Sequence, residues 1–188
     1  MGVTMKWVVR SLGWFATTTL LLMSVVACSD KESLTTASSS IASEIVSLDV
    51  YKSRTCGCCK KWISHIEDFG FESEVHHPAN LNKIKSDKGI EPRYQSCHTA
   101  VSSDGYVFEG HIPGQIIQQF LADPPKNAIG LAVPSMPVGS PGMEVGDRFD
   151  PYDVLLLMTD GSSEVYIHMA NAQSGLPGVG DSSSGEHP

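Results

Sequence analysis

The sequence predicts an α/β domain, and three observations lead to that class. Segments whose apolar residues fall at alternate positions, as in strands, alternate along the chain with segments whose apolar residues recur every three or four positions, as in helices. Glycines and turn-forming pairs separate the two kinds of segment. The chain of 188 residues is also long enough for one domain with a buried core.

The first half of the domain alternates between strand and helix. Trp62 and Ile66 lie on one face of the first helix, which Gly70 ends. Leu81 marks a second, shorter helix, which stops at Gly89. The expected elements are a strand over residues 44–51, a helix over 60–69, a strand over 71–76 and a short helix over 80–88.

The second half begins with a hairpin and a helix. Ser103-Asp104-Gly105 is a strong turn signal, and Pro113 stands where a helix begins. A stretch rich in proline, glycine and methionine over residues 124–143 interrupts the pattern, and Asp160-Gly161 marks a second hairpin. The expected elements are strands over 97–102 and 106–109, a helix from Pro113, and strands over 152–158 and 164–169.

The resulting order, β-α-β-α-β-β-α with an added C-terminal β-hairpin, is that of the thioredoxin-like fold. In that fold a Cys-x-x-Cys motif follows the first strand, at the N-terminus of the first helix. Cys56 and Cys59 occupy this place in the chain. We therefore expect a thioredoxin-like domain over residues 44–170.

The first 27 residues indicate export. Lys6 and Arg10 flank the start of an apolar run that is too short for a membrane-spanning helix, as in a signal peptide. The run ends in Val-Val-Ala before Cys28, which resembles the lipoprotein box whose cysteine carries the lipid; an ordinary cleaved signal is the alternative. Ser29 is typical of delivery to the outer membrane of a Gram-negative cell. We expect a lipid-anchored periplasmic protein.

The segments around the domain are polar, and the chain is acidic. Residues 28–43 are rich in serine and threonine and predict a disordered tether, while residues 171–188 predict a disordered tail. Cleavage before Cys28 would leave 161 residues with a formal charge of −10. Because an acidic protein is poorly suited to the phosphate backbone, we expect no nucleic-acid partner.

Four of the five cysteines form two clusters. Cys56 and Cys59 open a helix, where free amide groups and a partial positive charge favour thiolates. Such thiolates either form a redox-active pair or bind a soft ion such as Cu(I). Cys58 adds a third sulfur on the same turn, as a ligand or a spare thiol. A simple packing disulfide is the alternative, although adjacent Cys58 and Cys59 would crowd it.

Cys97 begins the third strand, where thioredoxin-like proteins usually carry a cis-proline that packs against the Cys-x-x-Cys motif. We expect its sulfur to meet the first cluster as a ligand; the alternative is a buried small hydrophobe. His98 is a candidate ligand, proton acceptor or surface residue. His111, just before a helix, is a ligand, a support for one, or an ordinary polar residue.

The loop over residues 132–143 predicts neither helix nor strand because of its prolines and glycines. It could place the thioethers of Met136 and Met143, which prefer Cu(I), or pack them inward in a rigid loop. No chemistry is expected of His65, inside the first helix. His76 and His77 close the second strand and are expected to be exposed.

Taken together, these motifs resemble the CopG-like copper-resistance family, small periplasmic proteins with a domain of formerly unknown function. Four separated strings carry the resemblance, which spans residues 48–169. They are Cys56-Gly57-Cys58-Cys59-Lys60-Lys61-Trp62, Ser96-Cys97-His98-Thr99-Ala100, Glu109-Gly110-His111-Ile112-Pro113, and the loop from Val133-Pro134 to Met143. The chain departs from the family at Ser135, where a glycine is expected, and this concerns the backbone shape of the loop.

The resemblance implies a thioredoxin-like fold, copper tolerance, and a cysteine-bridged multinuclear copper cluster. The ligands would be the thiolates of Cys56, Cys58, Cys59 and Cys97, with His98, His111, Met136 and Met143 as secondary positions. The expected function is Cu(I) binding for copper resistance, with exchange of copper with other periplasmic copper-handling proteins. If Cys56 and Cys59 are redox-active, the chain would be a copper oxidoreductase that interconverts Cu(I) and Cu(II).

Two other functions remain open at this point. A thiol–disulfide oxidoreductase acting on proteins would use the same Cys56 and Cys59, with one exposed attacking thiol. A non-catalytic lipoprotein would instead use the four cysteines in two structural disulfides. Zinc also suits a site of cysteines and histidines, but the methionine-containing loop favours copper.

Overall fold

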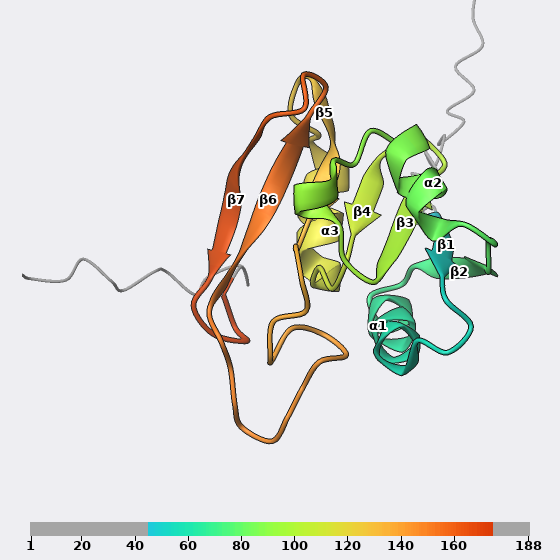
Figure 1. Cartoon of the computed structure of the whole chain (residues 1–188). Coiled ribbons are helices and arrows are strands. Elements are labelled where there is room, and N and C mark those ends of the chain that lie inside the picture. Colours follow the sequence, from blue (N-terminus) through green and yellow to red (C-terminus); the bar gives the residue numbers. More distant parts are fainter. Residues whose placement is uncertain (1–44, 175–188) are drawn as a thin grey trace, which may run out of the picture. The chain divides into compact units, whose positions relative to one another are not determined.

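The computed structural model describes residues 45–174, which form one mixed α/β unit (Figure 1). Strands and helices alternate in its first part, and strands dominate the last part. The elements are β1 (Ser47–Lys52), α1 (Gly57–Asp68), β2 (Glu72–His76), α2 (Leu81–Asp87), the 3₁₀ helix η1 (Pro92–Tyr94), β3 (His98–Ser102), β4 (Val107–Glu109), α3 (Gly114–Ala122), β5 (Ala128–Ala132), β6 (Tyr152–Met158) and β7 (Ser163–Met169).

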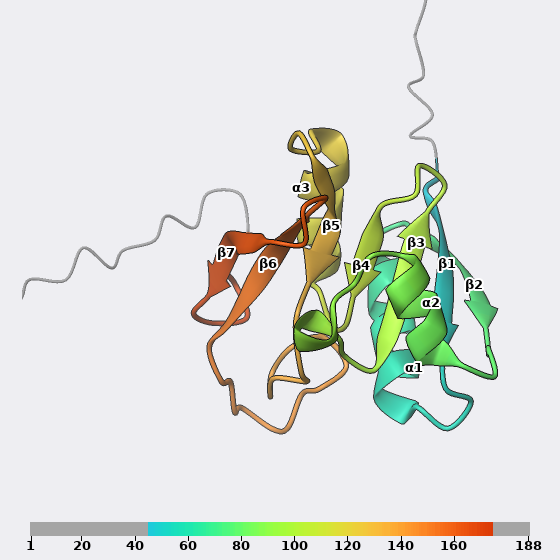
Figure 2. The ribbon, with the colours of Figure 1, turned by 45° about the horizontal axis from the view of Figure 1, so that its top comes forward.

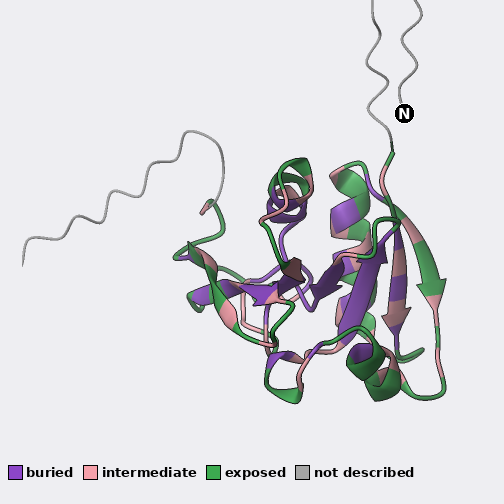
Figure 3. Ribbon diagram, turned by 90° about the horizontal axis from the view of Figure 1, so that it is seen from above, coloured by how far each residue is buried: buried purple, intermediate pink, exposed green. Residues whose placement is uncertain are grey.

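The described strands make one seven-stranded sheet in the order β2-β1-β3-β4-β5-β6-β7. The pairs β1–β2 and β4–β5 are parallel, and the other neighbouring pairs are antiparallel. Strands β3 and β4 are buried along their whole length, whereas β2 at the edge is exposed or half-buried (Figure 3). Because β3 lies beside β1, the start of β3 comes close to the loop that follows β1.

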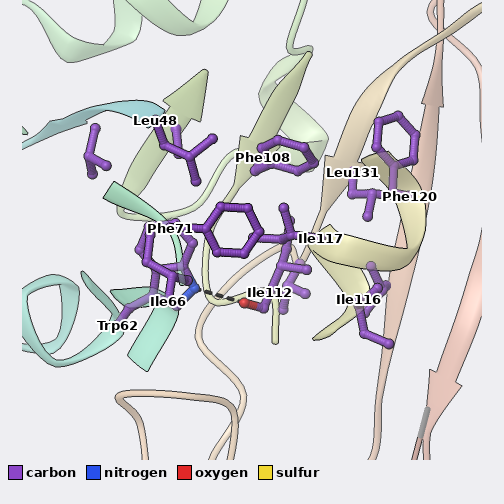
Figure 4. Close-up of a cluster of buried hydrophobic side chains, with 14 of the residues drawn as sticks. Leu48, Trp62, Ile66, Phe71, Phe108, Ile112, Ile116, Ile117, Phe120 and Leu131 are labelled. Carbon is purple, nitrogen blue, oxygen red and sulfur yellow. Dashed lines mark hydrogen bonds between the residues drawn. The ribbon is translucent and has the colours of Figure 1, made fainter. Parts of the chain in front are cut away.

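Each face of the sheet carries its own apolar cluster. The larger cluster packs α1 and α3 against the sheet through Trp62, Ile66 and Phe120, and the Trp62 indole N–H donates a hydrogen bond to the Ile112 carbonyl at 2.8 Å (Figure 4). The smaller cluster lies on the other face and contains Ile90 and Tyr94. Figure 2 shows α2 and α1 on opposite sides of β1 and β3.

The α/β class predicted from the sequence is confirmed. The order β-α-β-α-β-β-α runs from β1 to α3, and the hairpin β6–β7 follows at the C-terminal end. Helix α1 begins at Gly57, three residues earlier than expected. The assignment of this order to the thioredoxin-like folds stays a prediction.

One strand, β5, was missed because it lies in the stretch expected to interrupt the pattern. Its sequence, Ala-Ile-Gly-Leu-Ala, has a central glycine that lowers strand propensity. Gly130 is nevertheless required, because its φ is +148° and a Cβ there would lie 1.8 Å from the Val107 carbonyl oxygen. Pairing with β4 and β6 forms this strand, and neither partner is visible in its local sequence.

The terminal segments fall largely outside the described residues. These are the expected signal peptide over 1–27, the lipid site Cys28, the tether over 28–43 and the tail beyond residue 174. Residues 171–174, expected to begin the disordered tail, form a turn in which the Ser174 N–H donates to the Asn171 carbonyl at 3.1 Å. In the range 45–174, no helix is both long enough and apolar enough to cross a membrane.

Candidate metal centre

The N-terminus of α1 is built around a sulfur atom. Cys56 is the N-cap of the helix, and its Sγ accepts a hydrogen bond from the Cys59 N–H at 3.2 Å. Cys56 and Cys59 are joined by a disulfide, so Cys58 does not crowd this bridge out. The first-turn amide groups and the helix dipole stabilise negative charge at this place, which favours the thiolates when the disulfide is reduced.

Two free thiols flank this disulfide. The Sγ of Cys58 lies 3.5 Å from the Sγ of Cys56, and the Sγ of Cys97 lies 3.4 Å from the Sγ of Cys59. All four sulfur atoms lie within 4.8 Å of one another. The structure therefore brings Cys97 to the first cluster, as the sequence predicts, and the four sulfurs are close enough to share metal ions.

His111 faces Cys97 from the loop between β4 and α3. Its Nδ1 lies 2.7 Å from the Pro141 carbonyl oxygen, and its Nε2 lies 3.0 Å from the Cys97 Sγ. Because a carbonyl only accepts, Nδ1 carries the proton, and in the neutral ring Nε2 offers a lone pair to the thiol. Burial lowers the pKa of His111, although the hydrogen bond to Pro141 opposes this shift. His111 is thus oriented as a ligand or a proton acceptor.

His98 lies on the inner side of Cys97 and is fully buried. Its Nδ1 lies 3.3 Å from the Cys97 Sγ, and its ring packs 4.2 Å from Trp62 and 5.0 Å from His111. Among the described residues, its Nε2 is one of two buried side-chain polar atoms without a hydrogen-bond partner. Burial lowers its pKa well below the usual value, and nearby His111 and Lys85 add to this effect. A neutral, partly unpaired imidazole beside a thiol is suited to metal binding.

The candidate centre therefore consists of two groups that share one sulfur. Cys97 belongs both to the four-cysteine group and to a group with His98 and His111, whose ligand atoms also lie within 4.8 Å of one another. Burial raises the pKa of the Cys97 thiol to about 12, and the neighbouring Cys58 adds to this effect. The thiol is consequently protonated at neutral pH, and it must lose a proton to bind a metal ion.

The loop between β5 and β6 covers the N-terminus of α1. Gly142 has a φ of +87°, and a Cβ there would lie 2.7 Å from the Cys58 carbonyl oxygen, so the loop backbone packs directly on the first turn of α1. Ser135, where the family resemblance leads us to expect glycine, has a φ of +65°, a conformation that glycine adopts more easily. Met136 is exposed and Met143 is half-buried, and their role as ligands stays a prediction.

A buried polar network supports Cys97 from behind, and sequence reasoning missed it. Lys85 forms an ion pair with Glu109, and the Thr99 hydroxyl donates to the second Glu109 oxygen at 2.6 Å. Glu109 also accepts the Ser96 N–H at 2.6 Å, which anchors the peptide before Cys97. The Ser96 hydroxyl donates to the Ser135 carbonyl and so connects this peptide to the covering loop. The only sequence signal was a carboxylate at an otherwise apolar strand position.

Two further groups near the centre have structural roles or supply charge. His65, of which we expected no chemistry, accepts a hydrogen bond at its Nε2 from the Gly114 N–H at 3.0 Å and so caps α3.

Lys52 is buried at the end of β1, opposite His98 in the register with β3. Burial and nearby Lys60 lower the pKa of Lys52, whereas Cys58 and Cys97 raise it. Sequence reasoning had given Lys52 no role.

Comparisons with known proteins agree with this geometry. A family described as "Protein of unknown function, DUF411" matches residues 94–143, which contain Cys97, His98, His111 and the first part of the covering loop. Among curated proteins, none matches the chain. Two solved structures, titled "Copper resistance protein copG- Form 2" and "Copper resistance protein copG- Form 1", are each 42% identical to the chain with a TM-score of 0.63. Each alignment covers 66% of this chain and 98% of the other. With that identity over nearly the whole relative, the chain belongs to the CopG-like copper-resistance family.

Proposed function

We propose that the chain is a periplasmic copper-binding protein that serves copper resistance, and that it binds Cu(I) through the thiolates of Cys56, Cys58, Cys59 and Cys97. The relatives named for copper resistance and the cysteine cluster support a copper-related function. The observation that carries the proposal is the convergence of four sulfur atoms within 4.8 Å of one another. Thiolates are the ligands that Cu(I) prefers, and because each can bridge two ions, four of them can hold a small multinuclear cluster.

The two groups of the centre would suit two oxidation states of copper. The four-cysteine group offers only soft sulfur donors and favours Cu(I). The group of Cys97, His98 and His111 combines one sulfur with two imidazoles, a donor set that also accommodates Cu(II). Because Cys97 belongs to both groups, an ion could change its oxidation state with little movement. We therefore place the secondary ligands at His98 and His111, with Met136 and Met143 as additional thioether donors.

The disulfide adds a redox partner to this site. Oxidation of the Cys56–Cys59 dithiol to the disulfide releases two electrons and two protons, and two Cu(II) ions can each take up one electron to give two Cu(I) ions. The free thiols of Cys58 and Cys97, which flank the disulfide at 3.5 and 3.4 Å, would then hold the Cu(I) formed. Cys56 and Cys59 are the redox-active residues of this reaction. The reverse reaction would oxidise Cu(I) and restore the dithiol.

Metal analysis tests the proposal directly. Protein purified from cells grown with copper should contain several copper ions per chain in the Cu(I) state after reduction, and little zinc. A Cys56→Ser, Cys97→Ser double variant should lose most of this copper. A His168→Gln variant is the matched control, because His168 lies on β7 and belongs to neither group of the centre. If the double variant contains as much copper as the unchanged protein, the proposal is wrong. A site filled with zinc would indicate a zinc protein instead.

A second candidate function follows from the disulfide at the start of α1. Half-buried Cys56, at the N-terminus of a helix, is placed as an attacking thiol for exchange with other proteins. A thiol–disulfide oxidoreductase of this kind would reduce insulin with added dithiothreitol and without metal. Robust turnover without metal would favour this function over copper binding, and its absence would favour copper. Four cysteines oxidised in two disulfides would instead indicate a purely structural role, but Cys58 and Cys97 are free.

We also propose that Cys28 carries a lipid and anchors the chain to the outer membrane, with the domain in the periplasm. The support is the apolar run before Cys28 and the serine after it. Copper ions and periplasmic copper-handling proteins would be its partners there. Fractionation of cells expressing the full chain should place it in the outer membrane, and Cys28→Ser should release it. An unchanged distribution of the Cys28→Ser variant would contradict the anchor.

A further inference from the structure

A second group of metal-binding side chains lies on the outer strands β1 and β2. The His76 Nε2 lies 2.7 Å from a carboxylate oxygen of Asp49 and 3.9 Å from one of Glu74. The three side chains can each present one donor atom within 4.8 Å of the others. They come from two neighbouring strands, of which β2 is the edge of the sheet (Figure 1), and all three side chains are partly or largely exposed to solvent. Sequence analysis had expected only exposure of His76.

The sheet register places two negative charges directly opposite each other. Asp49 on β1 pairs with Glu74 on β2, and like charges at opposed positions destabilise a sheet. Burial raises the pKa of the neighbouring Tyr51, and the negative charges of Asp49 and Glu74 raise it further. Both carboxylates therefore act on the Tyr51 hydroxyl. The His76 ring is held beside the two carboxylates by stacking on Tyr51, with ring centroids 4.9 Å apart. A cation at this position would offset the repulsion.

A similar pair elsewhere in the described domain shows what is particular to this group. Asp153 on β6 and His168 on β7 also make a hydrogen bond of 2.7 Å, with His168 58% exposed where His76 is 33% exposed. Asp49, Glu74 and His76 form a group of three side chains that could bind one metal ion. Within the described residues, Asp153 and His168 belong to no such group. The pair His168–Asp153 is therefore a built-in control for an ordinary histidine–carboxylate contact.

We propose that Asp49, Glu74 and His76 form a surface site for Cu(II), distinct from the cysteine centre. Two carboxylates and one imidazole are donors for a divalent ion of intermediate hardness and do not suit Cu(I). Among first-row divalent ions, such a set binds Cu(II) most tightly, with water completing the coordination. The site uses no cysteine, so it is independent of the function proposed above. The chain would thus bind Cu(II) at its surface in addition to the copper held by the cysteine centre.

The test uses a background without free thiols, so that Cu(II) is not reduced. In the full chain with Cys28→Ser, Cys58→Ser and Cys97→Ser, the Cys56–Cys59 disulfide remains. Titration with copper(II) sulfate, followed by electron paramagnetic resonance, should show a Cu(II) ion bound by oxygen donors and one nitrogen. In this background, His76→Gln and Glu74→Gln should each weaken that binding at least about tenfold. The His168→Gln variant should bind as the background does.

A stability measurement keeps the test independent of folding defects. The Glu74 side chain is 75% exposed, and Glu74→Gln removes one of two opposed charges, so the metal-free variant should be no less stable than the background. Added Cu(II) should raise the melting temperature of the background and of His168→Gln, but not that of His76→Gln or Glu74→Gln. Equal affinities in the His76→Gln and His168→Gln variants, or a signal from two or more nitrogens that His76→Gln leaves unchanged, would overturn the proposal.

Discussion

The sulfur atoms of Cys59 and Cys97 lie 3.4 Å apart, although 38 positions separate the two residues in the sequence. Cys59 belongs to the first turn of α1, and Cys97 precedes β3, so the pairing of β1 with β3 brings them together. Their approach joins the disulfide to the group of Cys97, His98 and His111. This relationship makes one shared centre out of two sequence motifs, and the first prediction depends on it.

Replacing Cys97 should separate copper binding from disulfide chemistry. The variant Cys97→Ser loses the sulfur shared by both groups, and we expect Cu(I) affinity to fall by at least about tenfold. The Cys56–Cys59 disulfide should still form, because its two sulfurs are untouched. Competition with a Cu(I) chelator measures the affinity, and thiol counting by mass spectrometry reports the disulfide. Unchanged Cu(I) affinity would show that Cys97 is not a ligand.

Replacing His111 should affect copper affinity, whereas replacing His65 should affect stability. The variant His111→Ala removes a nitrogen 3.0 Å from the Cys97 sulfur and should lower copper affinity about 10- to 100-fold. The variant His65→Ala removes the acceptor of the Gly114 N–H and should cost about 1 kcal/mol of stability, with little effect on copper. Urea unfolding and copper competition on both variants provide the comparison. Equal loss of copper affinity in both would mean that the effect of His111 is indirect.

Copper binding should release protons at neutral pH. Burial raises the pKa of Cys97 to about 12, so this thiol is protonated until a metal displaces its proton, whereas His98 and His111 are already neutral because their pKa values are lowered. The apparent affinity should therefore rise with pH through the neutral range, about tenfold per pH unit for each proton released. Calorimetry in buffers of different ionisation enthalpy counts these protons. Heats that are the same in every buffer would contradict this expectation.

The buried pair of Lys85 and Glu109 should behave as a coupled unit. The variant Lys85→Met leaves the Glu109 carboxylate buried without its partner, and we expect it to lose about 3–5 kcal/mol of stability. The double variant Lys85→Met, Glu109→Gln removes the uncompensated charge and keeps an acceptor for the Ser96 N–H, so it should recover much of this loss. A double-mutant cycle by chemical denaturation gives the coupling energy. Simple additivity of the two substitutions would argue against the pair.

Ser135 offers a stabilising substitution. Its φ of +65° is unfavourable for a residue with a Cβ, so Ser135→Gly should raise the unfolding free energy by about 1 kcal/mol, reduced by the greater entropy of glycine in the unfolded chain. The carbonyl that accepts from the Ser96 hydroxyl is kept in the variant. Thermal unfolding measures the gain. A lower melting temperature would mean that the Ser135 side chain makes a favourable contact that outweighs the strain.

The elements that local patterns define were predictable, and those that depend on distant partners were not. Helix α1 and the hairpins carry their signals in apolar spacing and turn residues, so their existence followed from the sequence. Strand β5 has a glycine at its centre and forms only because β4 and β6 lie on either side. Its sequence therefore predicts an irregular segment.

The same distinction holds for the centre. The Cys-x-x-Cys spacing identifies Cys56 and Cys59, and the order of the elements alone predicts that Cys97 lies beside them. Sequence could not assign the polar network of Lys85 and Glu109, because a buried ion pair across 24 positions leaves no local pattern. The carbonyl of Pro141, which orients His111, belongs to the backbone and is invisible to residue type.

X-ray absorption at the copper edge of the reduced, Cu(I)-loaded protein tests the central claim most directly. The account predicts a first shell dominated by sulfur, together with a copper–copper distance short enough for bridging thiolates, and predicts that Cys97→Ser lowers the sulfur count. A first shell of only nitrogen and oxygen donors, or a sulfur count that Cys97→Ser leaves unchanged, would contradict it.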